Sequence, residues 1–254
     1  MREILRYRDL IRVLVERDLK VRYRRSAFGF LWTMLQPLLM MLVFTMVFAS
    51  IFRGDRPDYW IYALAGILFW NFFSQSIVAS MNSLRGNAQL LQKLPVPKIV
   101  FPLATVISGV INLGLALIPL FAILLLTGHR PGWAILFLPV AILLAAAFTL
   151  GAGLLLSPLA VFFTDVVELV GVLLTLLMYL TPVIYPYEIL PDKVRWIVRF
   201  NPLRSILEVF RDPIYLQKIP PMGHIAVSAG IAIVALVIGA WAFRKSSDRI
   251  PFYV

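Results

Sequence analysis

The chain alternates between long apolar runs and shorter polar segments that are mostly basic. A bilayer-spanning helix needs about 20 apolar residues, and six runs reach or approach that length: 28–52, 59–81, 99–127, 133–163, 167–185 and 225–243. Pro37, Pro119 and Pro139 fall inside three of them, which a packed membrane bundle tolerates. The pattern predicts an all-α, polytopic membrane protein with six transmembrane helices.

The first 25 residues have a different pattern, that of an amphipathic helix. At 100° per residue their apolar side chains fall on one arc, and most other positions are Arg, Asp or Glu. The members of that arc are Ile4, Tyr7, Leu10, Ile11, Leu14 and Val15. We expect residues 1–25 to form a cytoplasmic interfacial helix whose basic residues lie near lipid headgroups. Arg22, Arg24 and Arg25 anchor its end at the membrane, and a further role in gripping an anionic substrate or a cytosolic partner stays open.

The segment 186–222, between the fifth and sixth runs, interleaves apolar and charged residues. Pro191 and the pair Asn201-Pro202 divide it into two short helical pieces. These pieces are too polar to span the bilayer and too apolar for a free loop. We expect them to be short re-entrant helices on the outer side.

Composition agrees with a membrane protein. The 254 residues are 61% hydrophobic and 15% charged, whereas soluble domains are about 45–50% apolar and about 25% charged. A net charge of +11 would suggest nucleic-acid binding in a soluble protein. Here the basic residues flank membrane spans, as they do on the cytoplasmic side, so no nucleic-acid partner is expected.

The distribution of basic residues predicts the orientation. Residues 1–25 contain nine Lys or Arg, residues 82–98 contain three, and the tail 244–254 contains three. The intervening short loops hold only Arg53, Arg56 and Arg130. Both termini are therefore expected in the cytoplasm. Six basic residues in 186–222 argue the other way, but four acids dilute them and the rule is weaker for long segments.

The sequence predicts no catalytic residues, no metal site and no cofactor of its own. It lacks the phosphate-binding G-x-x-x-x-G-K-[ST], the H-E-x-x-H and the G-x-S-x-G motifs, and it has no cysteine. Transporters driven by protons or sodium bury ionisable groups within the membrane. Here the only candidates are Glu168, inside the fifth run, and Asp165 just before it, both near an expected cytoplasmic boundary. A protein that spans the membrane without an evident energy source needs a motor from elsewhere.

Four stretches carry a resemblance to a known family. They are RDLKVRYRRSAFGFLWTMLQPLLMMLVFTMVF (17–48), LFWNFFSQSI (68–77), NAQLLQKLPVPKIVFPLA (87–104) and TPVIYPYEILPDKVRWIVRFNPLRSILEVFRDPIY (181–215). In this order and spacing the chain resembles the permease subunits of ABC-2 type exporters. The likeness is closest to those that move O-antigen, capsular polysaccharide or teichoic acid across the bacterial inner membrane.

The resemblance implies a single transmembrane domain over 1–254 that works as a homodimer with two copies of a separate ATP-binding subunit. That partner would bind ATP and Mg, so this chain is not itself an enzyme, and the cargo would be a polysaccharide that we expect to be lipid-linked. The cytoplasmic segment 82–98 would be the coupling segment, with a coupling helix at roughly 87–97 that docks on the ATPase; its alternative is an ordinary basic turn. The implied contacts are Asn87, Gln89, Leu90, Leu91 and Lys93.

The resemblance also places aromatic residues on the pore-forming first and fifth spans. The candidates for the substrate pathway are Phe30, Trp32, Tyr179, Tyr185 and Tyr187. Aromatic side chains suit sugars because the ring stacks on the sugar and the Tyr O–H or Trp N–H forms a hydrogen bond. An interfacial aromatic belt explains these residues as well. An outer gate would include Pro186, Pro191, Asn201 and Pro202. The chain departs from the family pattern at Val96, where Phe is usual, and at Thr164, where Arg is usual.

Three alternatives remain open. The first is a permease of the same family that moves a lipid or a drug. The second is a membrane-embedded transferase for lipid-linked sugars, which needs clustered carboxylates; Glu188, Asp192, Glu208 and Asp212 are the candidates, although their spacing is typical of solvated charges. The third is a secondary transporter, which the uncharged spans disfavour.

Overall fold

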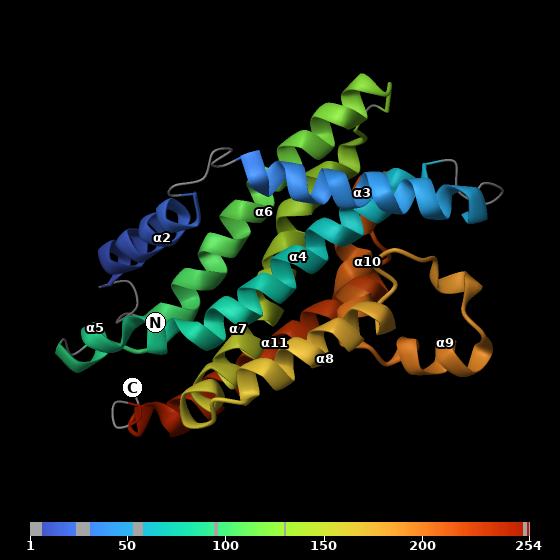
Figure 1. Cartoon of the computed structure of the whole chain (residues 1–254). Helices are drawn as coiled ribbons and strands as arrows, with labels where there is room; N and C mark the ends of the chain where they lie inside the picture. The colour runs from blue at the N-terminus through green and yellow to red at the C-terminus, as the bar shows by residue number, and fades with distance from the viewer. Residues whose placement is uncertain are drawn as a thin grey trace.

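The computed structural model describes residues 7–23, 31–52, 58–93, 96–129, 131–250 and 253, and in these ranges every regular element is a helix (Figure 1). The fold is therefore all-α, as predicted. The α-helices are α2 (Arg8–Tyr23), α3 (Leu31–Phe52), α4 (Tyr59–Ser83), α5 (Ala88–Lys93), α6 (Val100–Leu126), α7 (Leu138–Phe162), α8 (Val166–Leu180), α9 (Asp192–Arg199), α10 (Pro202–Tyr215) and α11 (Met222–Ser247). Three 3-10 turns are η1 (Arg85–Asn87), η2 (Trp133–Phe137) and η3 (Tyr187–Ile189).

Four of the described helices are long and apolar enough to cross a membrane: α4, α6, η2 with α7, and α11. The helix α8 is apolar but shorter, and α3 occupies 22 residues of the first expected run. The fifth run was expected to reach residue 185, but α8 ends at Leu180. Thr181 is extended because the following Pro182 disfavours helical backbone in the residue before it.

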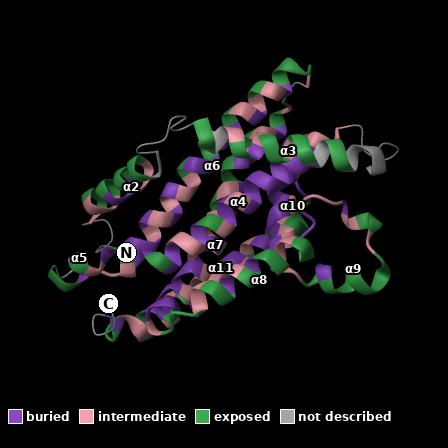
Figure 2. Cartoon of the chain, viewed as in Figure 1, coloured by how far each residue is buried: buried purple, intermediate pink, exposed green. Residues whose placement is uncertain are grey.

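The helix α4 lies at the centre of the bundle. The helices α3, α6, α7, α8 and α10 all pack against it, and it is buried along most of its length (Figure 2). This position follows from its sequence, since a helix that is apolar on every side over its first three turns is stable only when surrounded by other helices.

The helices α7 and α11 form the most extensive contact between two elements of the bundle. Their backbones meet at Gly151 and Gly239, where a Cβ added to Gly239 would lie 2.0 Å from the Gly151 carbonyl oxygen. Small residues permit this close approach, which is how membrane helices gain packing energy without a hydrophobic drive between them.

The segment 186–222 contains the two short helices predicted, and they have different environments. The helix α10 packs against α4, α7 and α11, with Ile206, Leu207 and Phe210 fully buried. The helix α9 projects from the bundle, and its Trp196 and Phe200 are exposed (Figures 1 and 2). The first is therefore part of the core, whereas the second is a surface element.

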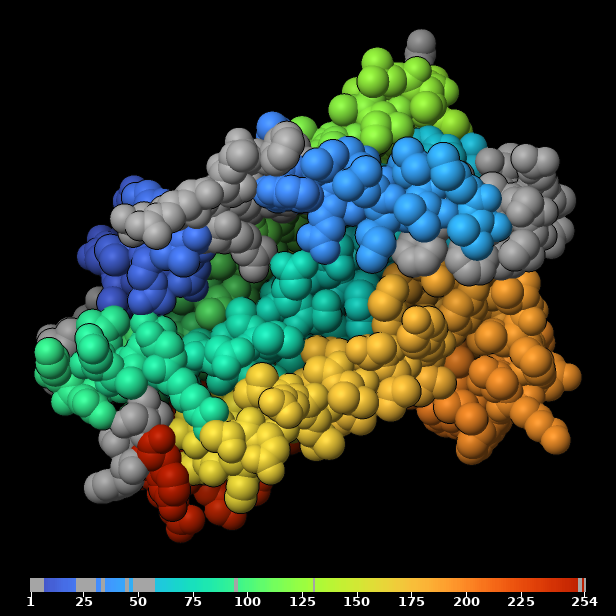
Figure 3. Space-filling model, in the orientation of Figure 1, coloured from blue at the N-terminus to red at the C-terminus, as the bar shows by residue number. Residues whose placement is uncertain are grey.

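The basic segments gather at one end of the molecule, which we call the basic end: residues 7–23, 84–93, 96–99 and 243–250. Leu14, Leu91, Phe243 and Ile250 share one buried cluster there, and Figure 3 shows α2, α5 and the end of α11 on the same side. Lys98 Nζ donates a hydrogen bond to the Ser247 carbonyl oxygen at 2.6 Å. Segments from three distant parts of the sequence thus form one surface.

A second cluster marks another end, which we call the tyrosine end: Tyr59, Tyr62, Tyr185 and Tyr215. It joins the start of α4 to the residues after α8 and to the end of α10. Two tyrosine hydroxyls hold this junction, because Tyr59 donates to the Ile184 carbonyl at 2.6 Å and Tyr62 donates to the Tyr185 carbonyl at 2.9 Å.

Candidate functional site

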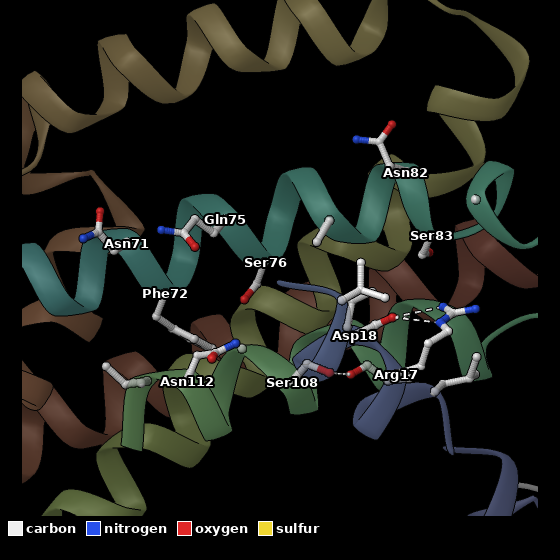
Figure 4. A pocket seen from close by; sticks show the side chains of 18 of the residues that line it. Arg17, Asp18, Asn71, Phe72, Gln75, Ser76, Asn82, Ser83, Ser108 and Asn112 are labelled. Atoms are coloured by element: carbon white, nitrogen blue, oxygen red, sulfur yellow. Dashed lines mark hydrogen bonds and ion pairs between the residues drawn. The ribbon is translucent and has the colours of Figure 1, made fainter. Parts of the chain in front are cut away.

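A cavity of about 840 Å³ lies between α2, α3, α4 and α6 (Figure 4). Its volume is in the range of roughly 300–1,000 Å³ found for ligand pockets. Although the surrounding helices are apolar, much of its lining is uncharged and polar. The uncharged polar lining residues are Gln36 from α3, Asn71, Gln75, Ser76, Asn82 and Ser83 from α4, Asn87 from η1, and Thr105, Ser108 and Asn112 from α6.

The amide side chains of α4 form a row. Asn71, Gln75 and Asn82 occupy positions i, i+4 and i+11, which lie on one helix face, and Figure 4 shows them on the same side of α4. An amide placed in an apolar environment without a hydrogen bond costs roughly 2–7 kcal/mol. Asn82 Nδ2 offsets part of this cost by donating to the Val78 carbonyl at 2.9 Å, and Gln75 and Asn82 are exposed. The row is therefore suited to contact with water or with a polar ligand.

Hydroxyl groups form a second wall between α4 and α6. Thr105 Oγ1 lies 3.0 Å from Ser80 Oγ, and Ser108 donates to the Ala104 carbonyl at 2.9 Å. Ser76 points from α4 toward α6 (Figure 4) and is only 3% exposed. Its Oγ makes no hydrogen bond to any described residue, so this buried hydroxyl keeps its capacity to bind a ligand or water.

The cavity's ionisable lining residues, Arg17 and Asp18, both come from α2. Arg17 Nη2 lies 3.0 Å from Asp18 Oδ1, so the two charges compensate one another. Arg17 Nη1 also donates to Asn87 Oδ1 at 2.7 Å, and Asn87 Nδ2 donates to the Ser83 carbonyl at 2.7 Å. These bonds tie α2 to the end of α4 and close the cavity at the basic end.

The predicted pathway aromatics are separated in the structure. Trp32 lines the cavity and is 46% exposed, whereas Phe30 lies outside the described residues. Tyr179, Tyr185 and Tyr187 lie away from this cavity. Tyr185 donates to the Tyr179 carbonyl at 2.6 Å, and Tyr179 itself is 66% exposed.

The Tyr187 ring makes cation–π contacts with two arginine side chains. The Arg204 guanidinium lies 3.4 Å from the centroid of its ring, and the Arg195 guanidinium lies 5.8 Å from it. Such cation–π contacts stabilise by about 0.5–2 kcal/mol. Tyr187 therefore links α9 and α10, and its contribution to a substrate pathway stays a prediction.

The predicted coupling residues face in two directions. Gln89 and Lys93 are exposed on α5, whereas Asn87 and Leu91 are buried and Leu90 is half-buried. The buried residues hold α5 against the basic end, which leaves Gln89 and Lys93 available to a partner.

Two other sequence predictions concern the same end. Arg22 belongs to α2, but its side chain lies outside what the structure describes, as do Arg24 and Arg25 entirely. Val96, where the family pattern has Phe, packs half-buried against the basic-end cluster.

The predicted gate residues occupy the boundaries of short helices. Pro186 precedes η3, Pro191 precedes α9, and Pro202 is the first residue of α10, a position that suits proline because the first N–H of a helix has no partner. Asn201 caps α10, since its Oδ1 accepts from the Leu203 N–H at 3.0 Å.

The same Asn201 side chain reaches the end of α8. Its Nδ2 donates to the Leu180 carbonyl at 3.1 Å and to Thr181 Oγ1 at 2.8 Å. One asparagine therefore begins α10 and fixes it to the residues that follow α8.

Sequence reasoning missed a buried arginine at the tyrosine end. Arg211 of α10 is 3% exposed, and its Nη2 donates to the Val183 carbonyl at 2.7 Å. Its guanidinium lies 3.7 Å from the centroid of the Tyr62 ring. Gly66 provides the space, because a Cβ there would lie 2.2 Å from the Val183 carbonyl oxygen. In the sequence Arg211 was one of several charges in 186–222, and no local signal distinguished it.

The carboxylates considered for a transferase do not converge. Asp192 is exposed and pairs with Arg195 at 3.2 Å, whereas Glu208 pairs with Arg204 at 2.7 Å. In the described part of the chain, no three His, Cys, Asp or Glu side chains are placed to hold a metal ion. Ion pairs between neighbouring turns thus account for Asp192 and Glu208, two of the four carboxylates.

Asp212 is the exception among these carboxylates. Burial raises its pKa to about 6, and the nearby Glu208 adds to the effect, while His224 and Arg211 oppose it. Glu208 is also 3.6 Å from His224 Nδ1. The carboxyl therefore exchanges its proton near neutral pH at the contact of α10 with α11.

Comparison with known proteins gives consistent results. The family described as "ABC-2 type transporter" matches residues 9–215. The O-antigen export system permease protein RfbA of Myxococcus xanthus is 32% identical over 98% of this chain and 96% of its own length. The protein of the same name from Klebsiella pneumoniae is 29% identical over 95% and 93%. The capsule polysaccharide export inner-membrane protein CtrC of Neisseria meningitidis serogroup B is 30% identical over 80% and 78%.

Proposed function

Because the chain belongs to the ABC-2 type transporter family, we propose that it is the permease subunit of an ATP-driven polysaccharide exporter. The cargo is a lipid-linked glycan such as O-antigen, capsule or teichoic acid, and it crosses the bacterial inner membrane. The names of the relatives support this assignment. The observation that carries it is the cavity, which places amide and hydroxyl groups of α4 and α6 inside an apolar bundle.

The proposed membrane arrangement has six spans: α3, α4, α6, η2 with α7, α8 and α11. The helix α2 lies at the cytoplasmic interface, and both termini are in the cytoplasm. The meeting of the three basic segments at one end supports this orientation, because basic residues concentrate on the cytoplasmic side. The segment 186–222 lies on the outer side, with α10 re-entering the bundle.

The motor is a separate ATP-binding subunit that holds ATP and Mg, and two copies of it serve two copies of this chain. The exposed side chains of Gln89 and Lys93 on α5 support docking at the basic end. The hydrogen bond from Arg17 to Asn87 would transmit motion of this segment to α2 and to the end of α4.

The homodimer would complete the conduit. On α3 and α8, the helices on either side of the exposed part of α4, apolar side chains face outward, including Leu39, Val43, Val172 and Leu176. Two copies that face one another along these helices would enclose the polar row of α4 and shield it from lipid.

Deletion of the gene in its own bacterium tests the function. The surface glycan should disappear while the lipid-linked glycan accumulates inside the cell, and a plasmid copy should restore export. In vesicles, nucleotide turnover should require both this chain and its ATP-binding subunit. Uphill transport by the chain alone would refute the proposal, and transport of a lipid without any glycan would favour the alternative cargo.

A further inference from the structure

We propose that the cavity between α2, α3, α4 and α6 selects uncharged, hydroxyl-rich sugar segments over anionic ones. The inference rests on the proposed function and specifies the chemistry of the exported glycan. It concerns the array of polar side chains in the cavity wall and the charges that surround it.

The donor and acceptor set matches sugar hydroxyls. An asparagine or glutamine amide carries a carbonyl acceptor and two N–H donors, and Asn71, Gln75 and Asn82 bring three amides to the cavity wall. One of these donors is already used, because Asn82 Nδ2 donates to the Val78 carbonyl at 2.9 Å. A sugar hydroxyl both donates and accepts, so adjacent hydroxyls bond to one amide in the same way. On the side of the same helix that faces α6, the Ser76 hydroxyl also lines the cavity, and its buried Oγ makes no bond to a described residue.

Aromatic surface is present beside these groups. Trp32 and Phe72 both line the cavity (Figure 4 labels Phe72). A sugar ring has an apolar face made of C–H groups, and an aromatic ring packs against it. The cavity thus has polar side chains for the hydroxyl groups of a neutral sugar and aromatic rings for its C–H groups.

The charges in and around the cavity do not suit an anion. The sequences of α3, α4 and α6 contain no ionisable residue apart from the tyrosines at the start of α4. Carboxylates and phosphates are bound in proteins chiefly by Arg or Lys. Arg17, the cation at the basic end of the cavity, already pairs with Asp18 and donates to Asn87. Among the described residues, the cavity offers an anionic sugar no unpaired cation in exchange for its lost hydration.

Opposite charges at one position test the inference. With a neutral cargo, Gln75→Lys and Gln75→Glu each lose the same amide bonds and each introduce an unpaired charge. Both variants should therefore lower the amount of surface glycan in the native bacterium by roughly tenfold, within about threefold of each other. With an anionic cargo, the Lys variant should export normally or better while the Glu variant fails, and this asymmetry would overturn the inference.

A control and a second position make the test decisive. Thr127→Lys and Thr127→Glu change an exposed residue outside the cavity in the same way and should leave export unchanged. Normal export by both Gln75 variants would also overturn the inference. If the Gln75 variants do not assemble with the ATP-binding subunit, the pair Asn71→Lys and Asn71→Asp replaces them.

Chemical analysis of the glycan gives an independent answer. The surface polymer that disappears on gene deletion should lack uronic acids, sialic acids and phosphate groups in its repeat. An acidic group in every repeat would overturn the inference and leave the proposed function intact. If deletion leaves every surface glycan unchanged, the proposed function itself fails.

Discussion

At the scale of single residues, the packing at the tyrosine end depends on a glycine, Gly66, which has no side chain. Gly66 lets the Val183 carbonyl and the Arg211 guanidinium approach the backbone of α4, where an added Cβ would lie 2.2 Å and 2.4 Å from them. The arginine is buried, and its hydrogen bond and its stacking on Tyr62 offset part of the cost of desolvating it. A glycine and an arginine distant in sequence thus act as one structural unit.

Replacement of Gly66 should therefore destabilise the protein. We expect Gly66→Ala to lower the free energy of unfolding in detergent by about 1–3 kcal/mol, because overpacking displaces the Val183 carbonyl from Arg211. Gly114→Ala is the matched control, since a Cβ there meets nothing within 4 Å. Equal melting temperatures for the two variants would show that the close contact at Gly66 contributes nothing to stability.

Asp212 should make stability depend on pH. Its folded pKa of about 6 exceeds the ordinary value of 3.8, so between these values the folded protein binds more protons than the unfolded chain. The free energy of unfolding should fall as pH rises from about 4 to about 6 and then level off. Asp212→Asn should lack this slope in thermal unfolding, whereas the exposed Asp192→Asn should keep it. The same slope in both variants would exclude Asp212 as its source.

At the scale of elements, the short helices are held by bonds at their ends. The start of α10 depends on Asn201, whose oxygen caps the helix and whose nitrogen binds the residues after α8. The position of α5 depends on Leu91 and Asn87, which are buried at the basic end. The helix α5 therefore combines an anchored side with an exposed side, whereas α10 is enclosed by its neighbours.

Two substitutions of Asn201 separate its roles. Asn201→Asp keeps the capping oxygen but loses both donated bonds, whereas Asn201→Ala loses all of them. We expect Ala to lower the free energy of unfolding more than Asp does, by about 1 kcal/mol, the typical contribution of a helix cap. Thermal unfolding measures the difference, and equal losses would mean that the cap contributes little.

The free side of α5 should carry the proposed coupling to the ATPase. Lys93→Glu reverses the charge of an exposed side chain, so it should reduce stimulation of the ATP-binding subunit while the fold is retained. Lys218→Glu makes the same change at an exposed position after α10 and should have no effect on stimulation. Full stimulation and assembly with Lys93→Glu would remove this residue from the interface.

At the scale of the whole molecule, the two ends differ in character. The basic end gathers α2, α5 and the end of α11, whereas the tyrosine end joins α4, α10 and the residues after α8. The cavity extends between the helices with its ionisable lining residues, Arg17 and Asp18, at the basic end. This difference between the ends agrees with the proposed docking of an ATP-binding subunit at the basic end.

Single cysteines test the proposed orientation without background labelling, because the chain has none. In intact cells, Lys93→Cys and Lys245→Cys should resist a membrane-impermeant maleimide, whereas Lys193→Cys should react. All three residues are exposed in the structure, so accessibility reports on the side of the membrane. Labelling of Lys93→Cys before permeabilisation would contradict cytoplasmic placement of the basic end.

The sequence by itself determined the features that depend on local pattern. Apolar length defined the long helices to within a few residues at most ends, and the run of alternating charge and apolar residues defined α2. Asn201-Pro202 separated α9 from α10, because proline starts a helix readily but cannot continue one. Such signals lie within one or two turns of the residues they affect.

Only the tertiary structure decided which polar residues meet. The amides of α4 looked like isolated exceptions in an apolar run until the packing of α6 brought Ser108 and Asn112 into the same cavity. Arg211 looked like a surface charge until α10 was placed between α4, α7 and α11. The physical reason is that contacts between distant helices depend on how each one rotates and packs in the bundle, and no local periodicity encodes that choice.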